Sequence, residues 1–140
     1  MQDQPFTFTT RLAKKPLAEY RPSVEAALKA EGFGVPTEMD VRALVKEKLG
    51  IDRPPFLILG ACNPALSNRI LGAAPEVGAL LPCNVVLRED GDAVVVEMID
   101  PRAMLGMVGD NPVAKEVAED ARARLRRAMT TIETEFASAG

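Results

Sequence analysis

The sequence contains no histidine and no tryptophan, and aromatic residues make up only 4% of it. Without histidine the chain lacks the most common general base, the Ser–His and Cys–His nucleophile pairs, and the histidine ligands of haem and of mixed zinc sites. The scarcity of aromatic rings argues against a surface on which nucleic-acid bases stack. These absences leave no recognisable catalytic set, so the sequence favours a protein that is not an enzyme.

Cysteine is also scarce, and the two that are present, Cys62 and Cys83, cannot complete a four-thiolate metal site within one chain. Neither charge sign dominates, because 17 basic residues stand against 20 acidic ones and no basic stripe indicates a nucleic-acid partner. The chain shows no signal peptide and no apolar run of membrane-spanning length. We therefore expect one soluble, cytoplasmic domain over residues 1–140, with reduced thiols and with no nucleic-acid or membrane partner.

The first half of the chain shows alternating strand and helix patterns. Apolar and polar residues alternate over residues 6–13, which predicts a strand. Helical spacing predicts a helix over residues 16–30, with a kink or a restart at Pro22 because proline lacks a backbone N–H. A short strand is expected over residues 34–41, followed by a helix that ends at Gly50.

The second half predicts the centre of the sheet and a long helix. The continuous apolar run FLILGAC, residues 56–62, is typical of a buried central strand. Residues 83–90 and 93–100 flank the turn signal Asp90-Gly91 and predict a β-hairpin. Residues 112–137 predict one long amphipathic helix. Its apolar stripe consists of Val117, Ala121, Leu125, Ala128, Ile132 and Phe136.

Three Asn-Pro or Asp-Pro dipeptides each precede a helical pattern. The side-chain oxygen of Asn63, Asp100 or Asn111 can accept a hydrogen bond from a free N–H of the first turn, and the following proline suits the first helical position. We expect all three residues to be structural N-caps. Asn84 differs because it opens an apolar strand, where asparagine is disfavoured. Its position therefore predicts a specific hydrogen bond from its side chain to nearby backbone.

Four motifs carry a resemblance to a known family. They are KAEGFGVPTEMDV, ILGACNPALSNRIL, PEVGALLPCNVVLRED and MIDPRAMLGMVG, in that order. Over residues 16–129 the chain resembles the bacterial and archaeal family catalogued as domain of unknown function 302. The resemblance implies an α+β fold of the TATA-binding-protein-like type, with one antiparallel sheet of about five strands, a long C-terminal helix packed across it and additional short helices. It also implies a homodimer, and it implies no activity.

Both cysteines stand in Cys-Asn dipeptides, at the two ends of one helix-and-loop excursion. If the strand that ends at Cys62 and the strand that begins at Cys83 are antiparallel, as the family implies, both thiols lie at the same end of the sheet. Small or apolar neighbours such as Ala61 and Leu81 surround them in the sequence. We therefore expect both thiols to be largely buried, reduced and close together, with burial raising the pKa of Cys83.

Three interpretations of the cysteine pair remain open: packing as small hydrophobes, a thiol redox pair, and a site for a soft metal such as Cu(I) or zinc. Packing is favoured, since free cysteine is among the most buried residue types. The sequence thus predicts a small dimeric binding or scaffold module with an unspecified ligand and cofactor. Its candidate binding residues are Cys62, Asn63, Cys83 and Asn84. The alternative is a thiol redox or soft-metal protein that uses Cys62 and Cys83.

Overall fold

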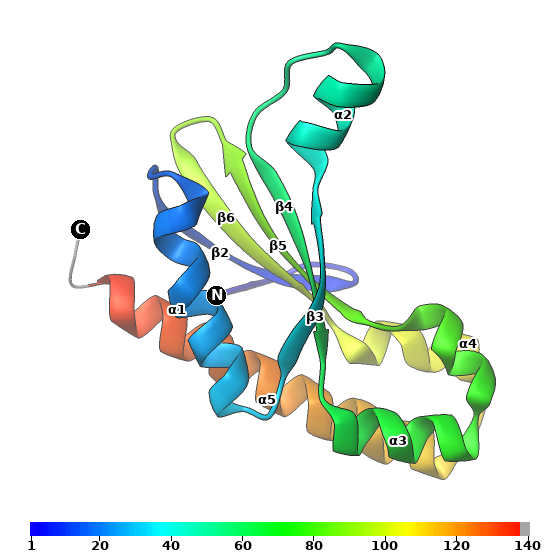
Figure 1. Ribbon diagram of the computed structural model, residues 1–140. Helices are drawn as coiled ribbons and strands as arrows, with labels where there is room; N and C mark the ends of the chain where they lie inside the picture. Colours follow the sequence, from blue (N-terminus) through cyan, green and yellow to red (C-terminus); the bar gives the residue numbers. More distant parts are fainter. Residues whose placement is uncertain (138–140) are drawn as a thin grey trace.

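The chain folds around one antiparallel sheet of six strands, seen in a computed structural model that describes residues 1–137 (Figure 1). The strands are β1 (Gln2–Asp3), β2 (Thr7–Ala13), β3 (Gly34–Asp40), β4 (Phe56–Cys62), β5 (Cys83–Asp90) and β6 (Ala93–Ile99). Their order across the sheet is β1-β2-β6-β5-β4-β3. The expected number of about five strands becomes six because β1, only two residues long, pairs with β2. A strand that short shows no alternation that a sequence pattern could reveal.

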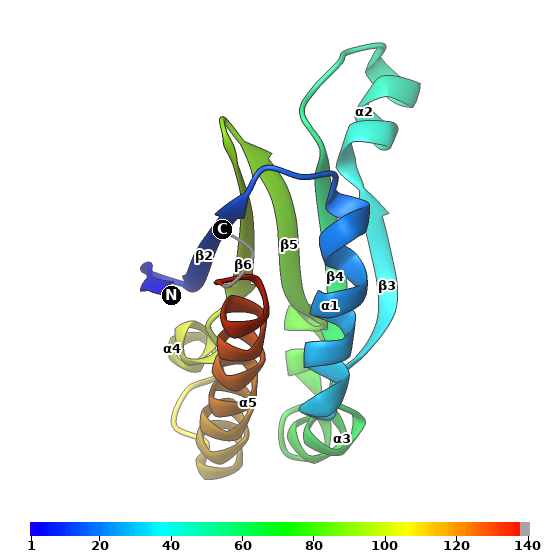
Figure 2. The ribbon, with the colours of Figure 1, turned by 90° about the vertical axis from the view of Figure 1, so that its left-hand side faces the viewer.

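Five helices and two 3-10 turns complete the described fold. They are α1 (Leu17–Ala30), α2 (Val41–Leu49), α3 (Pro64–Ala73), α4 (Leu105–Val108) and α5 (Pro112–Ala137), with η1 (Pro75–Leu80) and η2 (Pro101–Met104). Figure 2 shows α1 and α5 side by side against one face of the sheet, while α3 lies beside the first half of α5. No described helix lies across the other face, which we call the open face (Figures 1 and 2). The predicted α+β class is confirmed.

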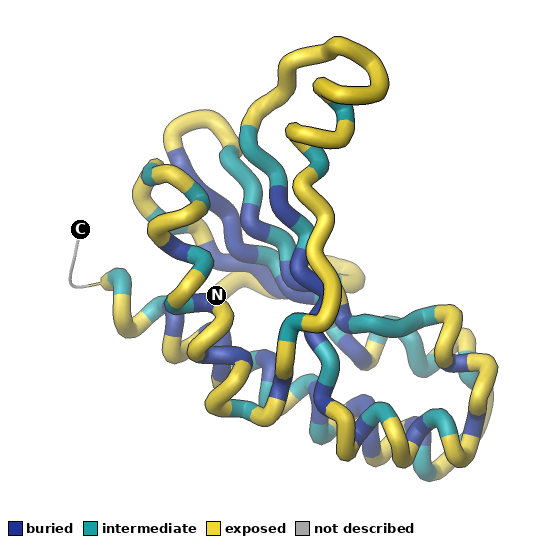
Figure 3. The backbone as a smooth tube through the Cα atoms, in the orientation of Figure 1, coloured by how far each residue is buried: buried dark blue, intermediate teal, exposed yellow. Residues whose placement is uncertain are grey.

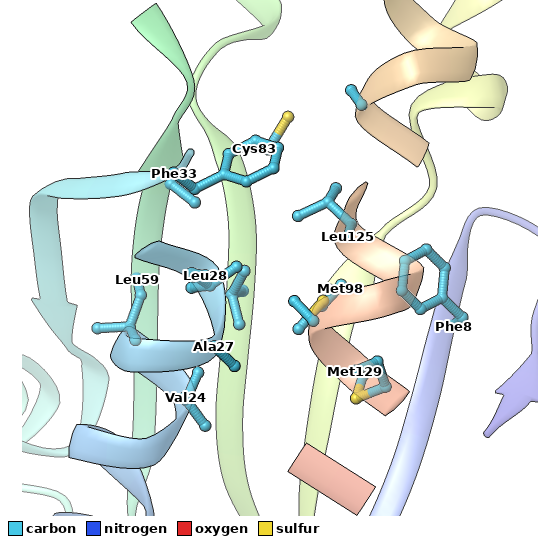
Figure 4. Close-up of a cluster of buried hydrophobic side chains, with 14 of the residues drawn as sticks. Phe8, Val24, Ala27, Leu28, Phe33, Leu59, Cys83, Met98, Leu125 and Met129 are labelled. Atoms are coloured by element: carbon cyan, nitrogen blue, oxygen red, sulfur yellow. The ribbon is translucent and has the colours of Figure 1, made fainter. Parts of the chain in front are cut away.

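The core lies between the sheet and the two covering helices. Figure 4 shows side chains from α1, α5 and the strands meeting there, with Phe33 and Cys83 at one end of the cluster. Leu28 of α1, Leu125 of α5 and Leu59 of β4 have no measurable exposure. Burying one such side chain stabilises the fold by about 1.5–3 kcal/mol, so this layer is the main source of stability.

The helix α1 runs without interruption from Leu17 to Ala30, so of the kink or restart expected at Pro22 the restart does not occur. Pro22 faces solvent, where water can satisfy the carbonyl that loses its partner. Gly32 lies two residues beyond the end of the helix, and its φ of 87° is the left-handed conformation that favours glycine. Two backbone bonds close the end: the N–H of Phe33 donates to the carbonyl of Leu28, and the N–H of Gly32 to that of Lys29.

The helix α2 lies apart from the core, on the segment that links the edge strand β3 to β4 (Figure 1). Asp40 caps its first turn by accepting from the N–H of Ala43 at 2.9 Å, and Gly50, with a φ of 67°, ends it. The helix is therefore capped at both ends, yet none of its residues is buried (Figure 3). None of the helices within residues 1–137 has both the length and the hydrophobicity needed to cross a membrane.

Candidate functional site

The chain turns sharply from β4 into α3 at Asn63. The Oδ1 atom of Asn63 accepts from the N–H of Leu66 at 3.2 Å and so occupies the N-cap position of α3. Its Nδ2 atom donates to the carbonyl oxygen of Glu31 at 3.4 Å. A Cβ atom on Gly32 would lie 2.8 Å from the same Nδ2, so the amide packs tightly beneath the end of α1. Asn63 thus connects the end of β4, the first turn of α3 and the end of α1 at one end of the sheet.

The two cysteines lie at that same end. The strand β4 ends at Cys62 and the antiparallel strand β5 begins at Cys83, but the residue opposite Cys83 is Ala61. Cys83 is buried, whereas Cys62 is only half-buried, so the expected burial holds fully for one thiol and partly for the other. Both cysteines are free. The Sγ atom of Cys62 lies 3.2 Å from the hydroxyl of Ser67, in the first half of α3.

Both cysteines and Asn63 line one apolar cavity of about 60 Å³ that is partly open to solvent. Its walls come from the ends of β4 and β5, from α3, η1, η2 and α4, and from the first half of α5. The side chains that define its shape are Phe33, Leu66, Ile70, Val77, Met104, Val108, Ala114, Ala118 and Ala121. Among the described residues, no buried side-chain nitrogen or oxygen lacks a hydrogen-bond partner. The cavity therefore suits an apolar group, because its described walls offer no buried side-chain nitrogen or oxygen that still needs a hydrogen-bond partner.

The buried thiol is poorly suited to chemistry. Loss of hydration and, as the smaller cause, the nearby charge that Cys62 can carry together raise the pKa of Cys83 to about 11. Cys83 is therefore a neutral thiol at physiological pH, and the thiolate is the form that attacks and binds metals. Within residues 1–137, no three His, Cys, Asp or Glu side chains gather closely enough to hold a metal ion.

The other predicted site residues lie away from the cavity wall. Asp100 accepts from the N–H of Arg102 at 3.0 Å at the start of η2, and both its oxygens lie 3.1 Å from Nε of Arg122. Asn111 accepts from the N–H groups of Val113 and Ala114 at 3.0 and 3.1 Å, at the start of α5.

Asn84 is exposed, opposite Gly60 in the β4–β5 pairing. Its side chain makes no hydrogen bond to the described residues, so the backbone contact expected from the sequence is wrong. Strand alternation explains the error, because Cys83 faces the core and its neighbour must then face the opposite side. Asparagine is tolerated at this position because water can hydrate it.

Part of the cavity wall was missed by sequence reasoning. The segment Pro101–Val108 closes one side, and its short helical turns have no periodic pattern that marks them as a wall. Alanines at 114, 118 and 121 recur at helical spacing and leave the room that larger side chains on α5 would fill. These alanines, among larger apolar residues on the buried face of α5, were the feature of the sequence that could have predicted a cavity beside this helix.

The comparisons with known proteins agree with this architecture. A crystal structure titled as an uncharacterised conserved protein DUF302 from Bacillus stearothermophilus superposes with a TM-score of 0.82 at 32% sequence identity. The match covers 91% of this chain and 98% of that one. A comparison with curated proteins gave no match. The family described as domain of unknown function DUF302 matches residues 8–132, and the chain therefore belongs to this family.

Proposed function

We propose that this protein is a non-catalytic binding module whose site is the apolar cavity between α3, α4, α5 and the ends of β4 and β5. The observation that carries this proposal is the composition of the walls, which are almost wholly apolar and include no acid or base other than the two thiols. Ligand sites are typically concave and lined mainly by hydrophobic side chains with a few polar groups, here Ser67 and Asn63.

The size of the cavity limits what it holds. Its volume of about 60 Å³ is less than half of the roughly 150 Å³ of an engineered apolar cavity that binds benzene. The group that enters is therefore smaller than an aromatic ring, such as a short alkyl chain. Because the cavity is partly open, the remainder of the ligand would lie outside, near Cys62 and Ser67.

Two measurements test this function. Native mass spectrometry of untagged protein should reveal a co-purifying small molecule. In amide NMR spectra, a series of short n-alkyl alcohols should shift the signals of residues around the cavity. The variant Ala118→Leu fills the space and should abolish those shifts, whereas Ala26→Leu, on an exposed face of α1, should preserve them. Shifts that are absent or scattered, or a turnover that one substitution abolishes, would contradict the proposal.

A second candidate function is thiol redox or soft-metal handling. It is favoured by the gathering of Cys62, Cys83 and the thioether of Met104 around one cavity, since Cu(I) selects sulfur ligands. The raised pKa of Cys83 opposes it, because a metal or an oxidant must first displace a firmly held proton. Metal analysis of untagged protein and thiol titration under hydrogen peroxide separate the two functions. In the redox case the two thiols give two electrons and two protons to the peroxide.

We also propose that the protein is a homodimer located in the cytoplasm. The edge strand β3 and several exposed hydrophobic side chains are features that association would cover. Pro36 and the irregular register between Gly34 and Thr37 hinder direct pairing along that edge, so another surface is needed. The free, buried thiol of Cys83 suits a reducing compartment. Light scattering that gives a monomer mass across micromolar concentrations would exclude the dimer.

A further inference from the structure

A groove lies directly outside the apolar cavity, on the open face of the sheet. Its volume is about 350 Å³, against about 60 Å³ for the cavity. Its apolar lining includes Phe6, Leu80, Pro82, Val86, Ile99 and Met107. The cavity and the groove share a wall, and that wall consists of two short segments of chain.

The first of these segments, residues 80–84, leads into β5. Leu81 and Cys83 line the cavity, whereas Pro82 and Asn84 line the groove. Successive residues thus face the two sides in turn, as the alternation of an extended chain requires. This part of the wall is therefore a single layer of backbone with its side chains on both sides.

The second segment, residues 99–108, leads from β6 through η2 into α4 (Figure 1). Pro101 and Val108 line the cavity, and Met107 lines the groove. Met104 is the only described residue that lines both. Its side chain is therefore the place where the cavity and the groove come closest to joining.

The side chain of Met104 can move without a change in the wall around it. It is half-buried, it has three rotatable bonds, and its thioether needs no hydrogen bond. The backbone is held on both sides. Arg102 donates to the carboxylate of Glu119 at 2.8 and 3.0 Å, and Asn111 caps the start of α5. A rotation of Met104 therefore opens the wall while the backbone keeps its position.

We infer that Met104 is a movable gate, and that with the gate open the cavity and the groove form one site for an unbranched aliphatic chain with an uncharged polar end. This inference rests on the proposed binding function and names its ligand class. The polar end lies near the thiol of Cys62 and the hydroxyl of Ser67, which line the cavity and not the groove. The first carbons fill the cavity, and the tail continues past Met104 into the groove.

The charges around the site select a ligand without charge. No aspartate, glutamate, lysine or arginine of residues 1–137 lines the cavity, so a charged end would lose hydration and gain no counter-charge. The one charged residue that lines the groove is Glu97. Its carboxylate already accepts from Nε of Arg88 at 3.4 Å and from the hydroxyl of Thr7 at 3.0 Å. A fatty alcohol therefore fits the site better than a fatty acid.

A series of n-alkyl alcohols from propanol to octanol tests the gate on the full chain by NMR titration. We expect the affinity to rise about fourfold for each added methylene over the whole series, because each one is buried. Propanol should shift the amide signals of cavity residues alone. Octanol should also shift those of groove residues, with one molecule bound per chain. Octanoate should bind about tenfold more weakly than octanol, because its carboxylate is charged, and equal binding would refute the uncharged end.

Truncation of the gate provides a second test. Met104→Ala should strengthen octanol binding by about threefold, because the open state no longer has to be populated first. The matched control is Met107→Ala, which shortens an exposed methionine that lines the groove alone and should not strengthen binding. If the two variants bind octanol equally well, Met104 is not a gate.

Substitutions in the groove show where the tail lies. Val86→Glu should weaken octanol binding by about tenfold and leave propanol binding unchanged, because it places a charge in the groove alone. The control Met39→Glu adds the same charge to an exposed position of β3 outside the groove and should affect neither alcohol. Asn84→Leu makes an exposed groove position apolar and should strengthen octanol binding, a result that does not depend on tolerance of the new charge.

The outcomes separate the gate from the proposed function. If short alcohols bind in the cavity and the affinity stops rising once the cavity is full, the gate is wrong and the binding function stands. Two octanol molecules per chain, or groove signals that still shift in Ala118→Leu, would show an independent groove site and also overturn the gate. If no alcohol shifts the signals of cavity residues, both the gate and the proposed function are wrong.

Discussion

Replacing Asn63 by alanine tests the claim that this residue connects three elements. Two hydrogen bonds are lost: Oδ1 no longer caps α3 through the N–H of Leu66, and Nδ2 no longer donates to the carbonyl of Glu31. Loss of an N-cap costs about 1 kcal/mol. The second bond, long at 3.4 Å, contributes up to about 1 kcal/mol. The carbonyl of Glu31 keeps a partner, since Nη1 of Arg124 donates to it at 3.2 Å, so no unsatisfied acceptor adds to the cost.

We therefore expect Asn63→Ala to lower the free energy of unfolding by about 2 kcal/mol, measured by urea denaturation with an unchanged m-value. Asn63→Asp keeps the capping oxygen but sets a carboxylate against the carbonyl of Glu31, so it should also destabilise the fold. The control is Asn68→Ala, the same substitution at an exposed position of α3, which should be neutral or slightly stabilising because alanine is the better helix former. If Asn63→Ala costs no more than Asn68→Ala, the cap and the link to α1 do not contribute as argued.

Three further predictions concern this end of the sheet. Gly60→Ala should cost about 1–3 kcal/mol, because its Cβ would lie 2.0 Å from Oγ1 of Thr37 and 2.6 Å from Cγ of Pro82; adding Thr37→Ala should recover part of the loss in the same denaturation assay. Cys83→Ser should cost about 1–3 kcal/mol by burying a hydroxyl without a partner, and a calorimetric melting temperature equal to that of wild type would contradict this. The raised pKa of Cys83, about 11 against 9.0 for an exposed thiol, means that its contribution to stability is full below pH 9 and lost as the pH rises towards 11. A Cys83→Ala variant should lack that part of the alkaline decline, and at neutral pH a thiol reagent should modify Cys62 first in the wild type.

The sequence predicts the elements well where a local signal marks them. Asn63-Pro64 and Asn111-Pro112 mark the starts of α3 and α5, and Asp90-Gly91 marks the hairpin between β5 and β6. These signals act through backbone groups within a few residues, so they do not depend on the tertiary fold. Local reasoning does not decide between a kink and a restart at Pro22, and the helix does not restart there, because water can hydrate the carbonyl group that loses its hydrogen bond to the proline.

The cavity and the exposed position of α2 could not be derived in the same way. The cavity has walls from many separate elements, so its existence depends on how α3, α4 and α5 meet the sheet. The spacing of Val41, Leu44, Val45 and Leu49 predicts an apolar face on α2, but Val41 and Val45 are only half-buried, and Leu44 and Leu49 are exposed. A periodic pattern of apolar residues shows that one face of a helix is apolar, but it does not show whether another part of the same chain packs against that face.

The two Cys-Asn dipeptides look alike in the sequence and have opposite arrangements in the structure. In the first, Asn63 is buried and Cys62 is half-exposed, because the chain leaves β4 there and turns into α3. In the second, Cys83 is buried and Asn84 is exposed, because β5 continues and alternates its side chains. The two thiols therefore cannot have equal roles. Cys83 packs the cavity wall as a neutral thiol, whereas Cys62, beside Ser67 and within reach of solvent, is the sulfur that a bound ligand or reagent would meet.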